Sequence, residues 1–259
     1  MIDALYIAGS GIQTQQTYVD VISNNIANVN TIGYKRESIS FSDMVSGSQS
    51  ANGNSVSQSP IAFSGNGATI NEIRPVFEDG DLRATNSELD LAISGRGFFE
   101  VELENGEQAY TRVGKLSINT DGKLATATGQ VLSANITVPL DAKAIEISST
   151  GEVHVNVPNE TNKVYIGELE LAKFSSPSEL DPVGYGLYKA TDSSGLAYYG
   201  KPSEAGFGDI RQGFVEVSNV SMVAEMVNLM LAQRAYQLNA RVVQAADQLM
   251  ETANNLTRG

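Results

Sequence analysis

The first thirty residues carry an apolar pattern that leaves few choices of structure. From Met1 to Val29 the pattern advances in alternating steps of four and three residues, with one polar member, Gln15. This is the a/d pattern of a helix that presents one narrow stripe to a partner helix. The sequence therefore predicts an N-terminal helix that packs lengthwise on another helix, through Met1, Leu5, Ala8, Ile12, Gln15, Val19, Ile22, Ile26 and Val29.

The rest of this predicted helix has very little charge. Between Met1 and Tyr34 the only charged side chains are Asp3 and Asp20. A surface helix normally carries charged residues opposite its apolar stripe, and neutral amides cost far less to remove from water than ions do. We interpret the segment as a helix enclosed on most sides by copies of itself; the alternative is an ordinary solvated helix of low charge. Its Asn-rich end predicts a stop between Asn28 and Thr31.

Composition excludes several classes of function. The 259 residues include no Cys, so neither a disulfide framework nor a thiolate metal site is expected. The formal net charge of -13 argues against nucleic acid or an anionic membrane as a partner. No apolar run reaches transmembrane length, and the lack of a basic residue before Lys35 predicts no cleavable secretory signal. We expect a cytoplasmic protein or one that leaves the cell without a cleaved signal.

The chain then divides by composition. Residues 1–36 form the predicted helical segment, and 37–71 a linker with a neutral insert that has no charged residue from Ser46 to Asn71. The insert is typical of a flexible linker, although a neutral segment could also become ordered between subunits. Residues 72–215 alternate in the manner of strands, with hairpin signals at Asn105-Gly106 and Asp121-Gly122. We predict an all-β domain there.

A second long helix is expected over 216–259, beginning after a plausible N-cap at Ser221. Its apolar residues recur about every 3.6 residues, the period of an undistorted helix. The fold class predicted is α+β, with paired N- and C-terminal helices and a central β domain. The stripe comprises Val227, Leu231, Ala235, Leu238, Val242, Ala245, Leu249, Thr252 and Leu256.

Motifs of catalysis or ligand binding are weak. Gly95-Arg96-Gly97 lacks the third glycine and the following helix of a dinucleotide loop, so we expect a bend between close strands. The segment 119–122 lacks the later ligands of a calcium loop, which favours a hairpin turn. His154 has no second His or Cys for zinc. Thirty acidic residues always allow a carboxylate pair, but none has a local context that raises a pKa. We expect no enzyme, cofactor or metal site.

Several motifs resemble those of bacterial flagellar rod and hook proteins. The segment 23–36 reads S-N-N-I-A-N-V-N-T-I-G-Y-K-R and is similar to their N-terminal signature. Further matches lie in the centre and near the C-terminus, so the resemblance covers almost the whole chain. The motif residues are Gly33, Gly97, Phe98, Phe99, Tyr110, Thr111, Arg112, Gly114, Gln212, Gly213, Ser218, Asn219, Gln233, Arg234, Ala235 and Tyr236.

The resemblance implies a structural subunit of a hollow helical polymer, whose paired terminal helices form an inner tube. Length and the neutral insert most resemble the distal-rod members, which act as a drive shaft between motor and hook. The alternatives are a proximal-rod paralogue, another axial protein, or a secreted β-domain that serves as a binding module. The residues expected at helix–helix or subunit contacts are Leu5, Ile12, Val19, Ile22, Asn25, Ile26, Asn28, Val29, Leu231, Leu238, Val242, Leu249 and Leu256.

The resemblance also implies partners and a location. The expected partners are other copies of the chain, other rod subunits, hook proteins, ring bushings and the flagellar type III export apparatus, with neither nucleic acid nor a small-molecule substrate. The expected location is the periplasm-spanning rod of the basal body, reached without cleavage. The insert near 46–71 is implied to order between subunits and stiffen the rod.

Overall fold

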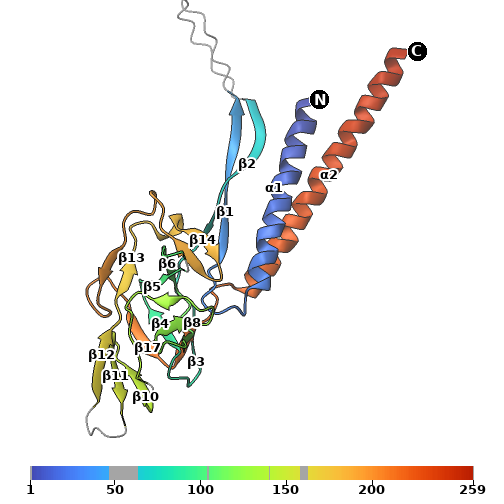
Figure 1. The fold of residues 1–259 in the computed structure, drawn as a ribbon. Helices are drawn as coiled ribbons and strands as arrows, with labels where there is room; N and C mark the ends of the chain where they lie inside the picture. Colours follow the sequence, from blue (N-terminus) through green and yellow to red (C-terminus); the bar gives the residue numbers. More distant parts are fainter. Residues whose placement is uncertain (1, 47–63, 104, 140, 158–162, 259) are drawn as a thin grey trace, which may run out of the picture. The chain divides into compact units, whose positions relative to one another are not determined.

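The computed structural model describes residues 2–46, 64–103, 105–139, 141–157 and 163–258. The chain forms two compact units, each treated by itself below (Figure 1). The first, called the helical unit, comprises Met1–Ala27, Glu37–Arg74 and Ser221–Gly259. The second, called the β unit, comprises Asn28–Arg36 and Pro75–Val220. The order of elements confirms the predicted fold class, with a helix at each end of the chain and strands between them.

Two long helices dominate the helical unit. Helix α1 spans Ile2–Ala27 and helix α2 spans Met222–Arg258, and the two lie side by side (Figure 1). The end of α1 falls one residue before the predicted range, where Asn residues favour turns over helix. Within the described residues, neither helix is both long and apolar enough to cross a membrane. The pairing of the terminal helices expected from their apolar periodicity is confirmed.

A two-stranded sheet completes the helical unit, where the sequence predicted a linker. Strand β1 spans Glu37–Ser46 and strand β2 spans Ser64–Pro75. Contacts with α1 explain the ordering: the Phe41 ring meets Tyr18 edge to face at 5.5 Å, and the Thr14 hydroxyl lies 3.2 Å from the Ala68 carbonyl oxygen. These contacts outweigh a polar composition with weak strand propensity. The remainder of the predicted insert, 47–63, lies outside the described residues.

The β unit is built almost entirely of short antiparallel strands, as predicted. A seven-stranded sheet has the order β14-β15-β6-β5-β9-β8-β7, and smaller sheets pair β10-β11-β12, β13-β16, β17-β4 and β18-β3. The strands are β3 Leu82–Ala84, β4 Leu91–Ser94, β5 Phe99–Glu102, β6 Gln108–Thr111, β7 Leu116–Ile118, β8 Leu124–Thr126, β9 Val131–Leu132, β10 Ala144–Ile147, β11 Glu152–Asn156, β12 Val164–Glu168, β13 Leu171–Lys173, β14 Asp181–Gly184, β15 Leu187–Lys189, β16 Tyr198–Gly200, β17 Asp209–Gln212 and β18 Phe214–Glu216. One 3₁₀ turn, η1, spans Pro177–Glu179.

The turn predictions are confirmed. Asn105-Gly106 connects β5 to β6, and Asp121-Gly122 connects β7 to β8. In the second turn the Asn119 side-chain oxygen accepts hydrogen bonds from the backbone N–H groups of Asp121 and Lys123, at 3.0 and 2.8 Å. The side-chain oxygen of Asn119 is therefore occupied by hydrogen bonds within the hairpin turn. The segment around Arg96 is a bend that approaches other backbone closely, since the Gly208 N–H donates to the Arg96 carbonyl oxygen at 2.7 Å.

Two hydrophobic clusters stabilise the β unit. The larger one is formed by residues that alternate inward along the strands, among them Leu91, Val101 and Val153, which are fully buried. The smaller one is largely aromatic and contains Phe98 and Tyr110. Because neighbouring residues of a strand point to opposite faces, Phe98 enters the aromatic cluster and Phe99 the larger core. The unit thus has a complete core of its own.

Candidate functional site

The predicted stripe of α1 faces the interior of the helical unit. Ile22 is only 1% exposed and Ala8 is also buried. The remaining stripe residues are partly buried: Leu5, Ile12, Val19 and Ile26 in α1, with Asn28 and Val29 partly buried just beyond it. Thr14, Val21 and Asn25, which lie outside the heptad stripe, are also buried, so the buried surface of α1 is wider than the predicted stripe.

The face of α2 toward α1 includes small and polar residues at its closest contacts. Asn239 lies so close to α1 that a Cβ atom on Gly11 would come within 2.8 Å of its amide nitrogen. Ala232 lies seven residues before Asn239 and Ala246 seven residues after it, so the three share one side of the helix. Both alanines are buried. Gly11 and these alanines allow the two backbones to approach closely. The sequence analysis did not single them out, because it followed the larger apolar residues.

The predicted apolar stripe of α2 is exposed within a single chain. Five of its large side chains are between 47% and 79% accessible: Leu231, Leu238, Val242, Leu249 and Leu256. More apolar side chains are exposed near the start of the helix, namely Met222, Val223, Met226, Val227 and Met230. A contiguous exposed apolar surface of this kind usually marks an interaction site. The role of the five residues in subunit contacts stays a prediction.

Two buried polar residues of α1 attach the neighbouring strands. The Asn25 amide nitrogen donates to the Glu37 carbonyl oxygen, and its side-chain oxygen accepts from the Glu37 N–H, both at 2.9 Å. Thr14 is also buried and its hydroxyl is 2.6 Å from the Ser10 carbonyl oxygen. A buried polar group is costly unless it is hydrogen-bonded. The Asn25 contacts fix the start of β1 against α1, and the Thr14 hydroxyl joins α1 to β2 through the Ala68 carbonyl oxygen. Asn25, expected at an assembly contact, has this role within the chain.

A buried ion cluster lies in the β unit and joins segments far apart in the sequence. The Lys35 ammonium is 2.5 Å from one oxygen of Glu216 and donates to the Glu78 carbonyl oxygen at 2.6 Å. The Arg112 guanidinium binds the other oxygen of Glu216 at 3.0 Å and Asp79 at 2.9 Å. It also donates to the carbonyl oxygens of Gly95 and Gly97, at 2.8 and 2.9 Å.

Burial and the neighbouring charges act in opposite directions on the pKa values of Glu216 and Lys35. Burial works against ionisation of Glu216, but Arg112 and Lys35 together outweigh it and keep the pKa of Glu216 below its usual value. Burial has the larger effect on Lys35 and lowers its pKa, although Glu216 opposes the change. The sequence analysis chose Arg112 from its motif but missed Lys35 and Glu216. The only local signal was that Lys35 is the first basic residue of the chain.

The motif residues around this cluster connect backbone segments. Gly33 has a φ of +70° and packs its α-carbon against Val113, so that a Cβ atom there would be 2.8 Å from the Val113 side chain. Its N–H donates to the Glu216 carbonyl oxygen at 2.8 Å. The Asn219 side chain accepts from the Arg36 N–H at 2.7 Å and donates to the Val76 carbonyl oxygen at 2.9 Å. Both segments that lead toward the helical unit are thus fixed within the β unit.

The remaining motif residues divide between the two units. In the β unit, the Gln212 amide nitrogen donates to the carbonyl oxygens of Glu88 and Ile145, both at 2.7 Å, and the Thr111 hydroxyl donates to the Gly186 carbonyl oxygen at 2.8 Å. The other motif residues of the β unit form backbone hydrogen bonds, in the case of Gly97, Gly114 and Gly213, or are buried, in the case of Ser218. On α2, Ala235 is partly buried, whereas Gln233, Arg234 and Tyr236 are exposed.

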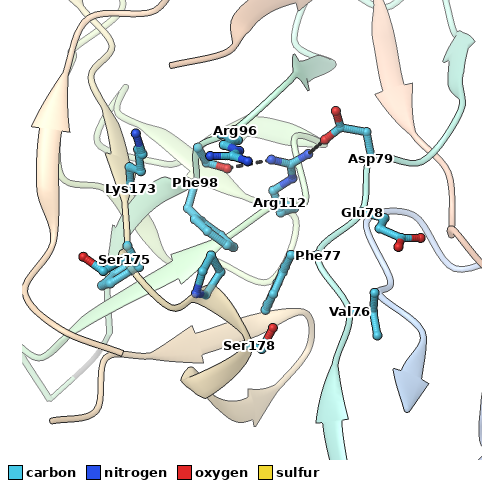
Figure 2. A pocket seen from close by; sticks show the side chains of 13 residues that line it. Val76, Phe77, Glu78, Asp79, Arg96, Phe98, Arg112, Lys173, Ser175 and Ser178 are labelled. Carbon is cyan, nitrogen blue, oxygen red and sulfur yellow. Dashed lines mark hydrogen bonds and ion pairs between the residues drawn. The ribbon is translucent and has the colours of Figure 1, made fainter. Parts of the chain in front are cut away.

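A cleft of about 360 Å³ opens beside the ion cluster in the β unit (Figure 2). One wall is the segment Val76–Asp79, and the other includes Lys173 and Ser178. Phe98 and Arg112 lie between the two walls. No group of three or more His, Asp or Glu residues is placed to bind a metal ion in the part of the chain that the structure describes.

Comparison with known proteins identifies the family. Residues 5–35 match the model described as flagella basal body rod protein, 92–155 that of the flagellar hook protein FlgE/F/G D1 domain, and 211–256 that of the flagellar basal body rod FlgEFG protein C-terminal. The flagellar basal-body rod protein FlgG of Caulobacter vibrioides is 38% identical over 98% of both chains, and that of Borreliella burgdorferi is 36% identical over 100% of both. The chain belongs to the flagellar basal-body rod protein family.

Membership of this family establishes the functional class of the chain. The chain is a structural subunit of the flagellar basal-body rod, of the distal-rod kind, and is not an enzyme. The flagellar basal-body rod protein FlgF of Caulobacter vibrioides is 30% identical, less than the FlgG protein of the same organism. The family predicted from the motifs is therefore confirmed, and so is the preference for the distal rod.

Proposed function

We propose that the chain polymerises helically into a hollow shaft that transmits motor torque to the hook. The observation that carries the proposal is the exposed apolar stripe of α2. Leu231, Leu238, Val242, Leu249 and Leu256 recur along one side of the helix over more than half its length and are 47–79% exposed in one chain. Copies of the helical unit that surround one another would remove these side chains from water. The helical units would then form the inner tube of the polymer.

Simple energetics supports assembly through this stripe. Complete burial of a Leu or Val side chain contributes about 1.5–3 kcal/mol, so each of the five, which is about half exposed, would add roughly 1 kcal/mol. Because the five side chains lie along the length of α2, their small contributions would add up along one line of contact between subunits. The low charge of α1 and the exposed motif residues Gln233 and Tyr236 make the rest of the surface inexpensive to desolvate.

The partners and the location are proposed from the family. We infer that other rod subunits and hook proteins adjoin the polymer, that ring bushings surround it, and that the chain is exported without cleavage by the flagellar type III apparatus. The insert over 46–71 would stiffen the polymer once it is packed between subunits. Amino-terminal sequencing of the assembled protein tests the export proposal, because a cleaved product would begin after Met1.

The assembly proposal is tested with the purified full-length chain. We expect light scattering to rise with concentration and electron micrographs to show straight tubes. The Leu238→Glu variant places a charge on the exposed stripe and should raise the concentration needed for growth by about tenfold, since a charge is costly to bury. Gln244→Glu, an exposed position of α2 outside the stripe, is the matched control and should grow nearly as the unmodified chain does.

Two results would contradict the proposal. One is a soluble oligomer of fixed size that does not elongate at any concentration, which would favour a binding module. The other is equal growth of the Leu238→Glu variant and the unmodified chain, which would remove the stripe from the contact. Circular dichroism of both variants shows whether α2 has kept its helical content.

A further inference from the structure

The cleft of the β unit combines an apolar wall with basic groups at one end. Phe77 packs edge to face on Phe98 at 5.0 Å and on Tyr188 at 4.9 Å. Phe98 in turn contacts Phe174, at 5.9 Å between ring centres. Because these rings hold one another in place, the wall is formed before any ligand arrives. A rigid apolar wall lowers the entropic cost of binding.

The basic side chains of the cleft differ in how many ion pairs and hydrogen bonds they already form. Arg112 is committed to Glu216, Asp79 and two backbone carbonyl oxygens. Arg96 is exposed, and neither it nor Lys173 forms an ion pair with any residue that the structure describes. The Lys173 ammonium lies over the Phe207 ring, at 5.9 Å, and close to Gly206, where a Cβ atom would come within 3.0 Å of it. Two cations of the cleft are therefore available to an incoming anion.

The acidic groups of the cleft lie on the opposite wall. Glu78 and Asp79 belong to the same segment, and Asp79 is bound to Arg112 (Figure 2). Arg96 lies beside Arg112, and Lys173 belongs to the wall opposite Glu78 and Asp79 (Figure 2). An occupant would consequently be oriented, with its carboxylates toward Arg96 and Lys173 and its apolar part on the aromatic wall. This arrangement suits an extended peptide with acidic and apolar side chains better than a free anion.

The charge of the chain indicates which peptide is suitable. With 30 acidic and 17 basic residues, two copies repel one another at long range. Unpaired cations at a preformed cleft oppose that repulsion locally, because they meet a surface that is predominantly acidic on any other copy. A cleft on one copy that binds a different surface of the next forms a heterologous contact, which can continue along a filament.

We propose that the cleft binds an acidic segment of a second copy of the chain through Arg96 and Lys173. The β unit then contributes a directional contact to the polymer, in addition to the contacts of α1 and α2. The inference extends the proposed assembly and rests on it, although a contact between two copies can also be detected without elongation.

The test compares charge reversals inside and outside the cleft. The double variant Arg96→Glu with Lys173→Glu should raise the concentration needed for growth by about tenfold and reduce its dependence on salt. The double variant Lys115→Glu with Arg211→Glu makes the same change in net charge at exposed positions outside the cleft. It should grow nearly as the unmodified chain does. Thermal unfolding of both variants checks that the β unit is intact.

A photo-crosslinker identifies the occupant. With p-benzoylphenylalanine in place of Ser178, an exposed residue that lines the cleft, irradiation should join two copies of the chain. Mass spectrometry of the adduct should find an acidic segment, and the yield should fall about tenfold with Arg96→Glu and Lys173→Glu. An adduct with a different protein, or a yield unaffected by the charge reversals, would overturn the proposal. Absence of tubes from the unmodified chain would count against the proposed function and leave the crosslink as a separate measurement.

Discussion

The helical unit and the β unit use their apolar residues in opposite ways. In the β unit Leu91, Val101 and Val153 are fully inaccessible to solvent. In the helical unit Leu249 and Leu256 of α2 are 60% and 79% exposed, while the buried face carries Ala232 and Ala246. The apolar side chains of the β unit therefore form a complete hydrophobic core within one chain. In the helical unit, α2 exposes several large side chains while alanines occupy its most buried positions.

The contrast shows that apolar periodicity alone does not tell which surface a helix buries within its own chain. Gly11 and the alanines of α2 let two helices approach closely, and such faces require few large side chains. The larger side chains are then left for another contact.

The largest expected effect is on the helical unit. Ile22→Asp places an unpaired charge at the centre of the buried face of α1, so we predict complete loss of tube formation and motility with export largely intact. The matched control is Ser23→Asp, which adds the same charge at the next, exposed residue. Electron microscopy and secretion assays measure the two outcomes. Normal swimming of the Ile22→Asp strain would contradict the assigned role of this face.

A second large effect is expected inside the β unit. Glu216→Gln leaves Lys35 buried without a counter-charge and leaves Arg112 with only the exposed Asp79 as its ion-pair partner among the described residues. Breaking a buried pair in this way costs about 3–5 kcal/mol. Urea unfolding measures the loss. Glu107→Gln, which removes an exposed partner of Lys189, serves as the control and should change stability little. Equal effects of the two substitutions would show that the cluster is not a major source of stability.

Neighbouring residues of α2 should respond in opposite ways. Ala232→Leu overfills the close contact with α1 and should cost about 1–3 kcal/mol. Leu231→Ala changes an exposed side chain and should alter the free energy of unfolding of a single chain by no more than about 0.5 kcal/mol, yet weaken assembly. Thermal unfolding of dilute protein and light scattering at high concentration separate the two effects. Destabilisation of the dilute chain by Leu231→Ala would mean that the stripe packs within the chain.

The smallest expected effect is on how the free energy of unfolding depends on pH. Because the pKa of Glu216 lies below its value of 4.5 in an unfolded chain, its ionisation stabilises the fold above that pH, and the contribution is lost as the pH falls through the lower, folded value. We expect the free energy of unfolding to decline below about pH 4.5. The decline should be shallower in Glu216→Gln, which has no carboxylate at this position. Identical pH profiles for the two proteins would argue against the coupling.

Much of the fold could be read from local patterns. The two terminal helices, the turns at Gly106 and Gly122 and the strand alternation each depend on neighbouring residues, and each is confirmed. The strands β1 and β2 could not be read in this way, because contacts such as Phe41 with Tyr18 order a polar sequence. The buried face of α2 was also missed, since small residues give a weak apolar signal.

The sequence by itself determined the family, the two terminal helices, the all-β middle and the low charge of α1. Those features depend on periodicity, turn chemistry and composition, which act over a few residues. Only the tertiary structure decided that Lys35, Arg112 and Glu216 share one buried cluster and that the large side chains of α2 remain accessible. Residues 181 positions apart meet there. Contacts over that separation depend on the arrangement of the whole β unit, which no local pattern specifies.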